Sequence, residues 1–145
     1  MTQGASDEST FEELSAGECL VLLSERSVGR FAVGAPGSSP LVVPVNYMMD
    51  GDAVVFRTGP GQKFDALGGQ PVSFQLDEID PSHHTGWSVL VKGKAYEATH
   101  WETDHLTIEP WAPGRKDRWV RIVPDEITGR RIRLAPFEPD PRAYL

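Results

Sequence analysis

One short stretch of the sequence carries three groups that bind anions well. Arg57 and Thr58 end an apolar run, and Lys63 follows them across a turn that contains Gly59 and Gly61. An arginine fork and a hydroxyl donate hydrogen bonds to phosphate oxygens, and glycines let backbone N–H groups come close to an anion. Lys63 is expected at the start of a short helix, whose dipole also favours an anion. The stretch therefore predicts a site for one terminal phosphate.

The alternative for this stretch is that its cations are only solvated, because the spacing of a Walker phosphate-binding loop is absent. A second group of cations lies near the end of the chain, where residues 115–145 hold eight Lys or Arg against five Asp or Glu. Either these cations form a solvated face of mixed sign, or four of them help hold an anionic ligand across a subunit boundary: Arg115, Lys116, Arg118 and Arg121.

Composition limits the partners and the setting of the protein. The chain has 145 residues and a net charge of −7, which argues against nucleic acid as the main partner. Cys19 is the single cysteine, so an internal disulfide is impossible and a reducing cytoplasm is the simplest setting. No apolar run approaches the length of a membrane span, and we expect no membrane partner.

Hydrophobic patterns predict the elements that would position the anion-binding groups. The capping-box pattern at 15–18 predicts a helix that runs to about Arg26. Pro44 places its own strand at a sheet edge or a bulge. The spacing of the strands predicts one mainly β domain, a small antiparallel barrel. Strands are expected at 28–33, 41–48, 53–58, 72–77, 87–95, 119–123 and 130–134, and helical turns at 63–67 and 103–108.

Three stretches of the sequence follow one another in a characteristic order: LVVPVNYMMDGDAVVFRTGPGQKFDAL, PVSFQLDEID and GWSVLVKGKA. Together they resemble the flavin-binding split-barrel family of pyridoxamine 5′-phosphate oxidase-like proteins, over residues 14–132. The closing PWAPGRKDRWVRIVPDEITGRRI is similar to the small bacterial members. The resemblance implies a six-stranded antiparallel split β-barrel that forms a homodimer, with FMN in the groove between the subunits. The expected organisation is a disordered leader at 1–10, the barrel domain at 11–135 and a tail at 136–145.

The resemblance also implies roles for particular residues. Groups that match Arg57, Thr58 and Lys63 grip the FMN phosphate in this family, so the expected anion is a flavin phosphate. Two other strands reach the isoalloxazine ring, and Asn46 could meet its polar edge. These strands contribute Val43, Pro44, Val45, Asn46, Trp87 and Ser88.

The chemistry expected from this resemblance is that of the flavin itself. The sequence shows no Ser-His-Asp pattern, carboxylate pair or metal-ligand spacing, so no catalytic side chain and no metal site is assigned. A flavin supplies redox chemistry to a protein that binds and orients it, and we expect an FMN-dependent oxidoreductase acting on a small organic substrate. The substrate-phosphate residues of the oxidase cannot be placed here, so oxidation of pyridoxamine phosphate is not expected.

Several alternatives stay open. The chain could be a deazaflavin-dependent reductase of the same fold, or a non-catalytic module that carries flavin or haem. It could also be a cofactor-free dimer whose site has decayed. Trp111 is expected either at a dimer interface or beside the flavin ring.

Overall fold

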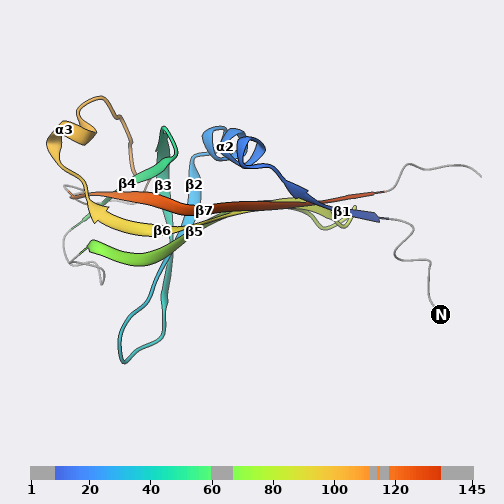
Figure 1. Ribbon diagram of the computed structural model, residues 1–145, viewed down its shortest axis with the longest axis horizontal. Coiled ribbons are helices and arrows are strands. Elements are labelled where there is room, and N and C mark those ends of the chain that lie inside the picture. Colours follow the sequence, from blue (N-terminus) through green and yellow to red (C-terminus); the bar gives the residue numbers. More distant parts are fainter. Residues whose placement is uncertain (1–8, 60–66, 112–113, 115–117, 135–145) are drawn as a thin grey trace, which may run out of the picture.

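A single antiparallel sheet closes on itself to form the barrel (Figure 1). The computed structural model describes residues 9–59, 67–111, 114 and 118–134. The strand order is β1-β7-β4-β3-β2-β5-β6, and a further pairing of β6 with β7 closes six strands into a ring. The seventh strand, β1, adds to the outside of β7. The six-stranded antiparallel barrel expected from the sequence is therefore confirmed.

The elements are β1 (Ser9–Leu14), α2 (Ala16–Ser24), β2 (Val28–Val33), β3 (Leu41–Asp50), β4 (Ala53–Thr58), β5 (Gly68–Asp80), β6 (Thr85–Glu97), α3 (His100–Thr103) and β7 (Arg118–Leu134). The expected helical turn at 63–67 falls largely on residues outside the described ones. The turn expected at 103–108 overlaps the end of α3 at Thr103 and the adjoining turn, in which the Leu106 N–H donates to the Thr103 carbonyl oxygen at 2.9 Å.

The helix α2 begins at the capping box that the sequence predicts. The Ser15 hydroxyl accepts a hydrogen bond from the Glu18 backbone N–H at 3.1 Å. The Glu18 carboxylate in turn accepts one from the Ser15 backbone N–H at 3.4 Å. These two bonds satisfy N–H groups that have no partner within the helix.

Replacing the capping serine is expected to destabilise the protein measurably. Ser15→Ala removes one acceptor and should lower the free energy of unfolding by about 0.5–2 kcal/mol. The measurement is chemical denaturation followed by circular dichroism. Ser24→Ala, in the last turn of the same helix, is the matched control and should change stability by less than about 0.5 kcal/mol. Equal effects of the two substitutions would contradict the capping role.

The strand β7 is one continuous strand, and the expectation of two separate strands at 119–123 and 130–134 was wrong. Pro124 interrupts the apolar pattern between them but lies at a bulge, where the register with β6 shifts. A proline is tolerated there because the ladder already lacks a bond. Its partner Gly93 has no room for a side chain, because a Cβ there would lie 2.2 Å from the Val123 carbonyl oxygen.

The strand β1 was not expected, and it includes Ser9 and Thr10, which the sequence assigned to the leader. Its sequence lacks a clear alternation of apolar and polar residues. Pairing with β7 makes it a strand, and this register sets Glu12 opposite Arg131 and Glu13 opposite Arg130. Opposite charges on facing residues stabilise such a pair.

Aromatic side chains fill the centre of the barrel. The rings of Phe31 and Phe56 lie 4.9 Å apart between centroids, and Tyr47 meets Phe74 edge-on at 4.8 Å. The Tyr47 hydroxyl donates to the Leu23 carbonyl, which fastens α2 to the barrel. Cys19 of α2 is fully buried and packs as an apolar residue, as expected, and this burial raises the pKa of its thiol.

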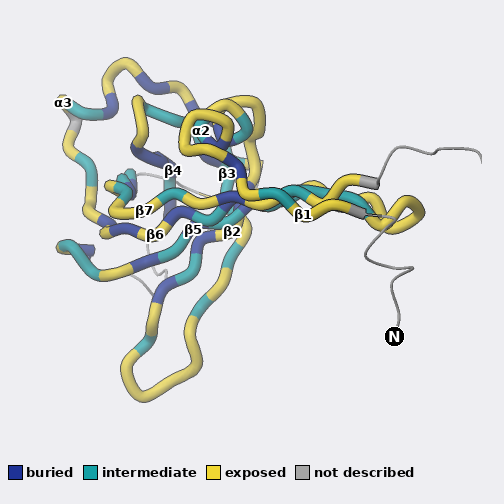
Figure 2. The backbone as a smooth tube through the Cα atoms, turned by 45° about the vertical axis from the view of Figure 1, so that its right-hand side comes forward, coloured by how far each residue is buried: buried dark blue, intermediate teal, exposed yellow. Residues whose placement is uncertain are grey.

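Four strands continue past the barrel as a ribbon, formed by 77–80, 85–88, 129–134 and 9–14. Figure 1 shows this ribbon extending away from α3 and β4, with β1 at its outer part. Figure 2 shows that the buried residues are concentrated in the barrel, whereas most of the ribbon is intermediate or exposed. The two ends of β7 therefore lie in different surroundings.

Candidate functional site

Arg57 and Thr58 end the strand β4, where they pair with Trp119 and Arg118 of β7. The Arg57 side chain is partly buried, and its Nη1 donates a hydrogen bond to the Ile108 carbonyl oxygen at 2.9 Å. Its guanidinium carbon also lies 5.2 Å from the centroid of the Trp119 ring. A planar guanidinium held by a hydrogen bond and a cation–π contact has a defined orientation.

The Thr58 hydroxyl is buried without a hydrogen-bond partner in the described part of the chain. The residue is only 4% exposed. Buried hydroxyls nearly always have a partner, and leaving one without costs about 1–3 kcal/mol. Successive side chains of a strand point to opposite faces, so a phosphate would meet both Arg57 and Thr58 only at the end of β4, which Thr58 terminates. Lys63, the third member of the expected grip, lies outside the described residues.

Asn46 lies next to this pair on the neighbouring strand β3. Tyr47 faces Phe56 across the β3–β4 ladder, so the residue before Tyr47 and the residue after Phe56 are neighbours. The Asn46 side-chain oxygen accepts a hydrogen bond from the Trp111 backbone N–H at 2.8 Å. The structure thus brings Asn46, Arg57 and Thr58 together, and we name these three residues the phosphate-end group.

The other β3 residues expected at the flavin divide between the two faces of the strand. Val43 and Val45 are partly buried and pack against the core of the barrel. Pro44 is exposed on the opposite face, in a part of β3 that pairs with β2 and not with β4. This edge-like position is the one expected for a proline within a strand.

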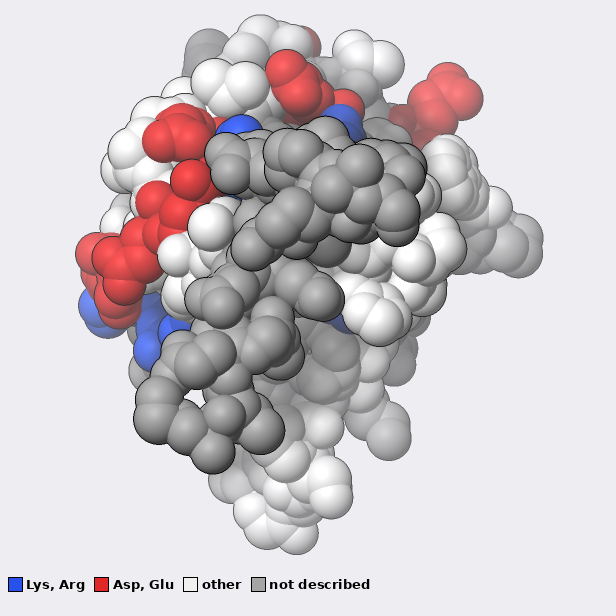
Figure 3. Space-filling model, turned by 90° about the vertical axis from the view of Figure 1, so that its right-hand side faces the viewer, with Lys and Arg blue, Asp and Glu red and all other residues white. Residues whose placement is uncertain are grey.

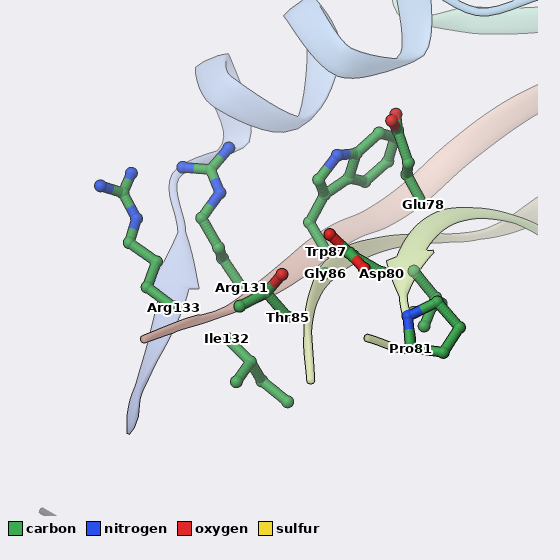
Figure 4. A pocket seen from close by; sticks show the side chains of 10 residues that line it. Glu78, Asp80, Pro81, Thr85, Gly86, Trp87, Arg131, Ile132 and Arg133 are labelled. Atoms are coloured by element: carbon green, nitrogen blue, oxygen red, sulfur yellow. The ribbon is translucent and has the colours of Figure 1, made fainter. Parts of the chain in front are cut away.

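Trp87 and Ser88 belong to the ribbon, on opposite faces of β6. Trp87 lines a groove of about 680 Å³ together with Arg131, Arg133 and the acidic Glu78, as Figure 4 shows. Ser88 lines a second hollow of about 340 Å³ on the other face. We name Trp87 and Ser88 the ribbon-end group.

The Trp87 ring has a fixed place at the wall of its groove. It packs against the core of the barrel, and the Arg26 guanidinium lies 5.2 Å from its centroid. Arg26 in turn forms an ion pair with Glu78. The ring can therefore present a defined apolar wall to a ligand.

The phosphate-end and ribbon-end groups lie far apart in one chain. Thr58 pairs with Arg118 of β7, and Trp87 pairs with Arg131, thirteen residues further along the same strand. At about 3.3 Å per residue this separation is roughly 40 Å along the strand, which is longer than a flavin mononucleotide. Figure 1 shows β4 and β1 at different ends of β7. The two groups therefore lie towards opposite ends of β7.

Two cations of the basic stretch near the end of the chain pair with carboxylates. Arg118 donates to Glu97 at 3.2 Å, and Arg121 donates to Asp50 at 2.6 Å. The bonds from Arg121 and His105 hold the pKa of the Asp50 carboxyl below its usual value. The expected alternative role of this stretch, a second anion-holding group, also involved Arg115 and Lys116, which lie outside the described residues.

Sequence reasoning missed the contacts that hold the phosphate-end group. The acceptor for Arg57 is a backbone carbonyl, that of Ile108, and its aromatic neighbour is Trp119. Every residue carries the same backbone groups, so the sequence does not reveal which of them form hydrogen bonds. The Trp119 contact could have been found only by pairing β4 with β7, because Arg57 and Trp119 are cross-strand partners.

Acidic side chains gather on one side of the molecule. Figure 3, which views the molecule along the ribbon, shows Asp and Glu along that side, with smaller patches of Lys and Arg. This distribution agrees with the net charge of −7. Among the described residues, no helix has the length and apolar character needed to cross a membrane.

The closed six-stranded barrel with one added strand defines a protein of the split-barrel class. Residues 15–131 match the family model described as pyridoxamine 5′-phosphate oxidase, and the chain belongs to this family. The resemblance inferred from the sequence is therefore confirmed.

Similar proteins come from several bacteria. An uncharacterised protein of Mycobacterium tuberculosis is 33% identical over 129 residues, which are 83% of this chain and 84% of the relative. The FAD-binding protein from Mycobacterium smegmatis has a TM-score of 0.65 and 31% identity, covering 86% of this chain and 100% of that one. An FAD-binding protein from Mesorhizobium loti has a TM-score of 0.64 and 25% identity, covering 86% and 98%.

Proposed function

We propose that this protein is a flavin-dependent oxidoreductase that works as a homodimer on a small organic substrate. The observation that carries the proposal is the buried Thr58 hydroxyl, which has no hydrogen-bond partner in the described part of the chain, at the strand end that also holds the oriented guanidinium of Arg57. Two similar structures, at 31% and 25% identity, are FAD-binding proteins. FMN and FAD both carry a phosphate after the ribityl chain, so the phosphate-end group suits either nucleotide.

Each residue of the site has a role in binding and orientation. Arg57 and Thr58 donate hydrogen bonds to the phosphate, and Lys63 adds a second cation. Asn46 offers its amide to the polar edge of the ring, while Val43, Pro44 and Val45 form the adjoining strand. A bound flavin supplies hydride transfer between a reduced donor and an acceptor, so this chain needs no catalytic side chain of its own.

A second subunit completes the site in this proposal. The ribbon-end group, Trp87 and Ser88, cannot reach the flavin held by the phosphate-end group of its own chain, because roughly 40 Å of β7 separates them. In a symmetric dimer the same two residues of the partner can reach it. Each flavin then contacts both chains.

Exposed apolar surface on the ribbon supports this dimer. Ile79, Gly86, Ile132 and Phe11 face one another in a single row across four strands. Ile79 is 62% exposed and Phe11 is 60% exposed. A contiguous apolar row of this kind is normally covered by another protein surface, and we assign the second subunit to it.

We also propose a cellular location and limit the choice of substrate. A single buried thiol and the absence of a disulfide suit the reducing cytoplasm. The residues that bind the substrate phosphate in the oxidase have no clear counterparts here, so a substrate other than pyridoxamine phosphate is expected.

Absorption spectroscopy of the purified, untagged protein tests the proposal. A flavin spectrum that NADH or NADPH bleaches is the expected result, and chromatography of the released cofactor then distinguishes FMN from FAD. A flavin that no donor reduces would replace the oxidoreductase with a binding module. Three results would contradict the flavin assignment: a deazaflavin spectrum, a Soret band, or a protein that retains no flavin on purification and binds none when flavin is added.

A further inference from the structure

A packed segment joins β6 to β7 beside the phosphate-end group. It runs from Thr99 to Trp111, contains α3, and is called the strap. The Glu102 carboxylate of α3 accepts hydrogen bonds from the backbone N–H and the hydroxyl of Thr99, both at 3.1 Å. Further along, Leu106 and Ile108 are buried. Figure 1 shows the strap arching away from the sheet and returning to it near β4. The buried residues and the hydrogen bonds between Thr99 and Glu102 give the strap a defined conformation.

The near end of the strap is fastened to the barrel at Asp50. The Asp50 carboxylate accepts a hydrogen bond from Arg121 Nη1 at 2.6 Å and lies 3.1 Å from His105 Nε2. Arg121 Nε also lies 3.7 Å from Glu102 of the strap. Asp50 and Arg121 are partly buried, with side chains 25% and 22% exposed. Charged hydrogen bonds in such surroundings are stronger than fully exposed ion pairs.

The far end of the strap holds two residues of the phosphate-end group. The Ile108 carbonyl accepts the hydrogen bond from Arg57 Nη1 at 2.9 Å. The Trp111 backbone N–H donates to the Asn46 side chain at 2.8 Å. Both bonds use backbone groups of the strap, so their geometry depends directly on where the strap lies. Asp50 pairs with Ala53 across the β3–β4 turn, and Arg57 lies four residues further along β4.

We infer that Asp50 is a positioning residue, which sets the orientation of Arg57 and Asn46 through the strap without touching the flavin. The inference rests on the proposed flavin function for its effect on binding. The inference is carried by a contiguous series of contacts, from Asp50 through His105 and the backbone of residues 105–111 to Arg57 and Asn46. A change at Asp50 therefore reaches the phosphate through Arg57 and the polar edge of the ring through Asn46.

The test combines affinity for two ligands with the exchange of one amide. Asp50→Asn keeps the side-chain volume and removes the charge that holds Arg121 and His105. It should raise the hydrogen-exchange rate of the Trp111 amide, measured by NMR. It should also lower the affinity for the flavin nucleotide that the wild-type protein retains, FMN or FAD, by roughly 2- to 30-fold. The affinity for riboflavin, which lacks the phosphate, should fall far less.

A double-variant cycle separates positioning from a general loss of stability. In an Arg57→Ala background, Asp50→Asn should lower the affinity for the flavin nucleotide much less than in the wild-type protein, because the effect through Arg57 is then absent and only the effect through Asn46 remains. His105→Gln breaks the contact from the strap side and serves if Asp50→Asn does not fold. Asp125→Asn, which breaks an exposed ion pair with Lys94, is the matched control and should change neither measurement.

The possible outcomes are distinct. An unchanged Trp111 exchange rate, an equal loss for riboflavin, or full additivity with Arg57→Ala would each overturn the positioning role. If the wild-type protein binds no flavin, the proposed function fails. The exchange rate of the Trp111 amide then decides alone whether Asp50 positions the strap.

Discussion

Combining an Arg57→Ala subunit with a Trp87→Ala subunit is expected to restore a flavin site that neither variant forms well. Each substitution alone damages both sites of a homodimer. In the mixed dimer, one site receives both damaged groups and the other receives neither, because the phosphate-end and ribbon-end groups that form a site come from different chains. The separation of roughly 40 Å within one chain requires this arrangement if both groups touch one flavin.

The measurement uses co-expression with two different affinity tags, so that only mixed dimers survive tandem purification. Titration with flavin should show about one site of near wild-type affinity per dimer. The control pairs Arg57→Ala with Thr58→Val, which lie in the same group, and should restore nothing. Light scattering on the same samples reports assembly. A monomer with full flavin affinity, or a mixed dimer no better than its parents, would refute a site shared between subunits.

Arg57→Ala by itself is expected to lower the affinity for flavin nucleotides strongly and the affinity for riboflavin only slightly. The guanidinium is oriented by the Ile108 carbonyl and the Trp119 ring, so it is prepared to bind an anion. A charge-assisted hydrogen bond contributes about 1.5–3 kcal/mol, which corresponds to a loss of roughly tenfold to 150-fold in affinity. Arg57→Lys should fall between the two, because it keeps the charge and loses the planar fork.

Fluorescence titration of the flavin-free protein with FMN, FAD and riboflavin measures this difference. Lys94→Ala is a suitable control because it removes an exposed cation that pairs with Asp125 on the barrel surface. An equal loss of affinity for riboflavin and the nucleotides would show that Arg57 supports the fold of the site and does not bind the phosphate.

The sequence alone determined those features that depend on a few neighbouring residues. The capping box at Ser15 and Glu18 predicted the start of α2, and alternating apolar residues predicted most of the barrel strands. The order of the motifs predicted the family and the six-stranded barrel. These signals are readable because caps, turns and strand periodicity arise from interactions within several residues of one another.

Only the tertiary structure decided the features that depend on pairing between distant segments. β1 is a strand because it meets β7, and Pro124 does not end β7 because a bulge accommodates it. The fold places Asn46 beside Arg57 and moves Trp87 to the other end of the same long strand. It also bonds the backbone of the strap to Arg57 and Asn46. Such arrangements depend on register and on backbone groups, which every residue carries and which no sequence pattern distinguishes.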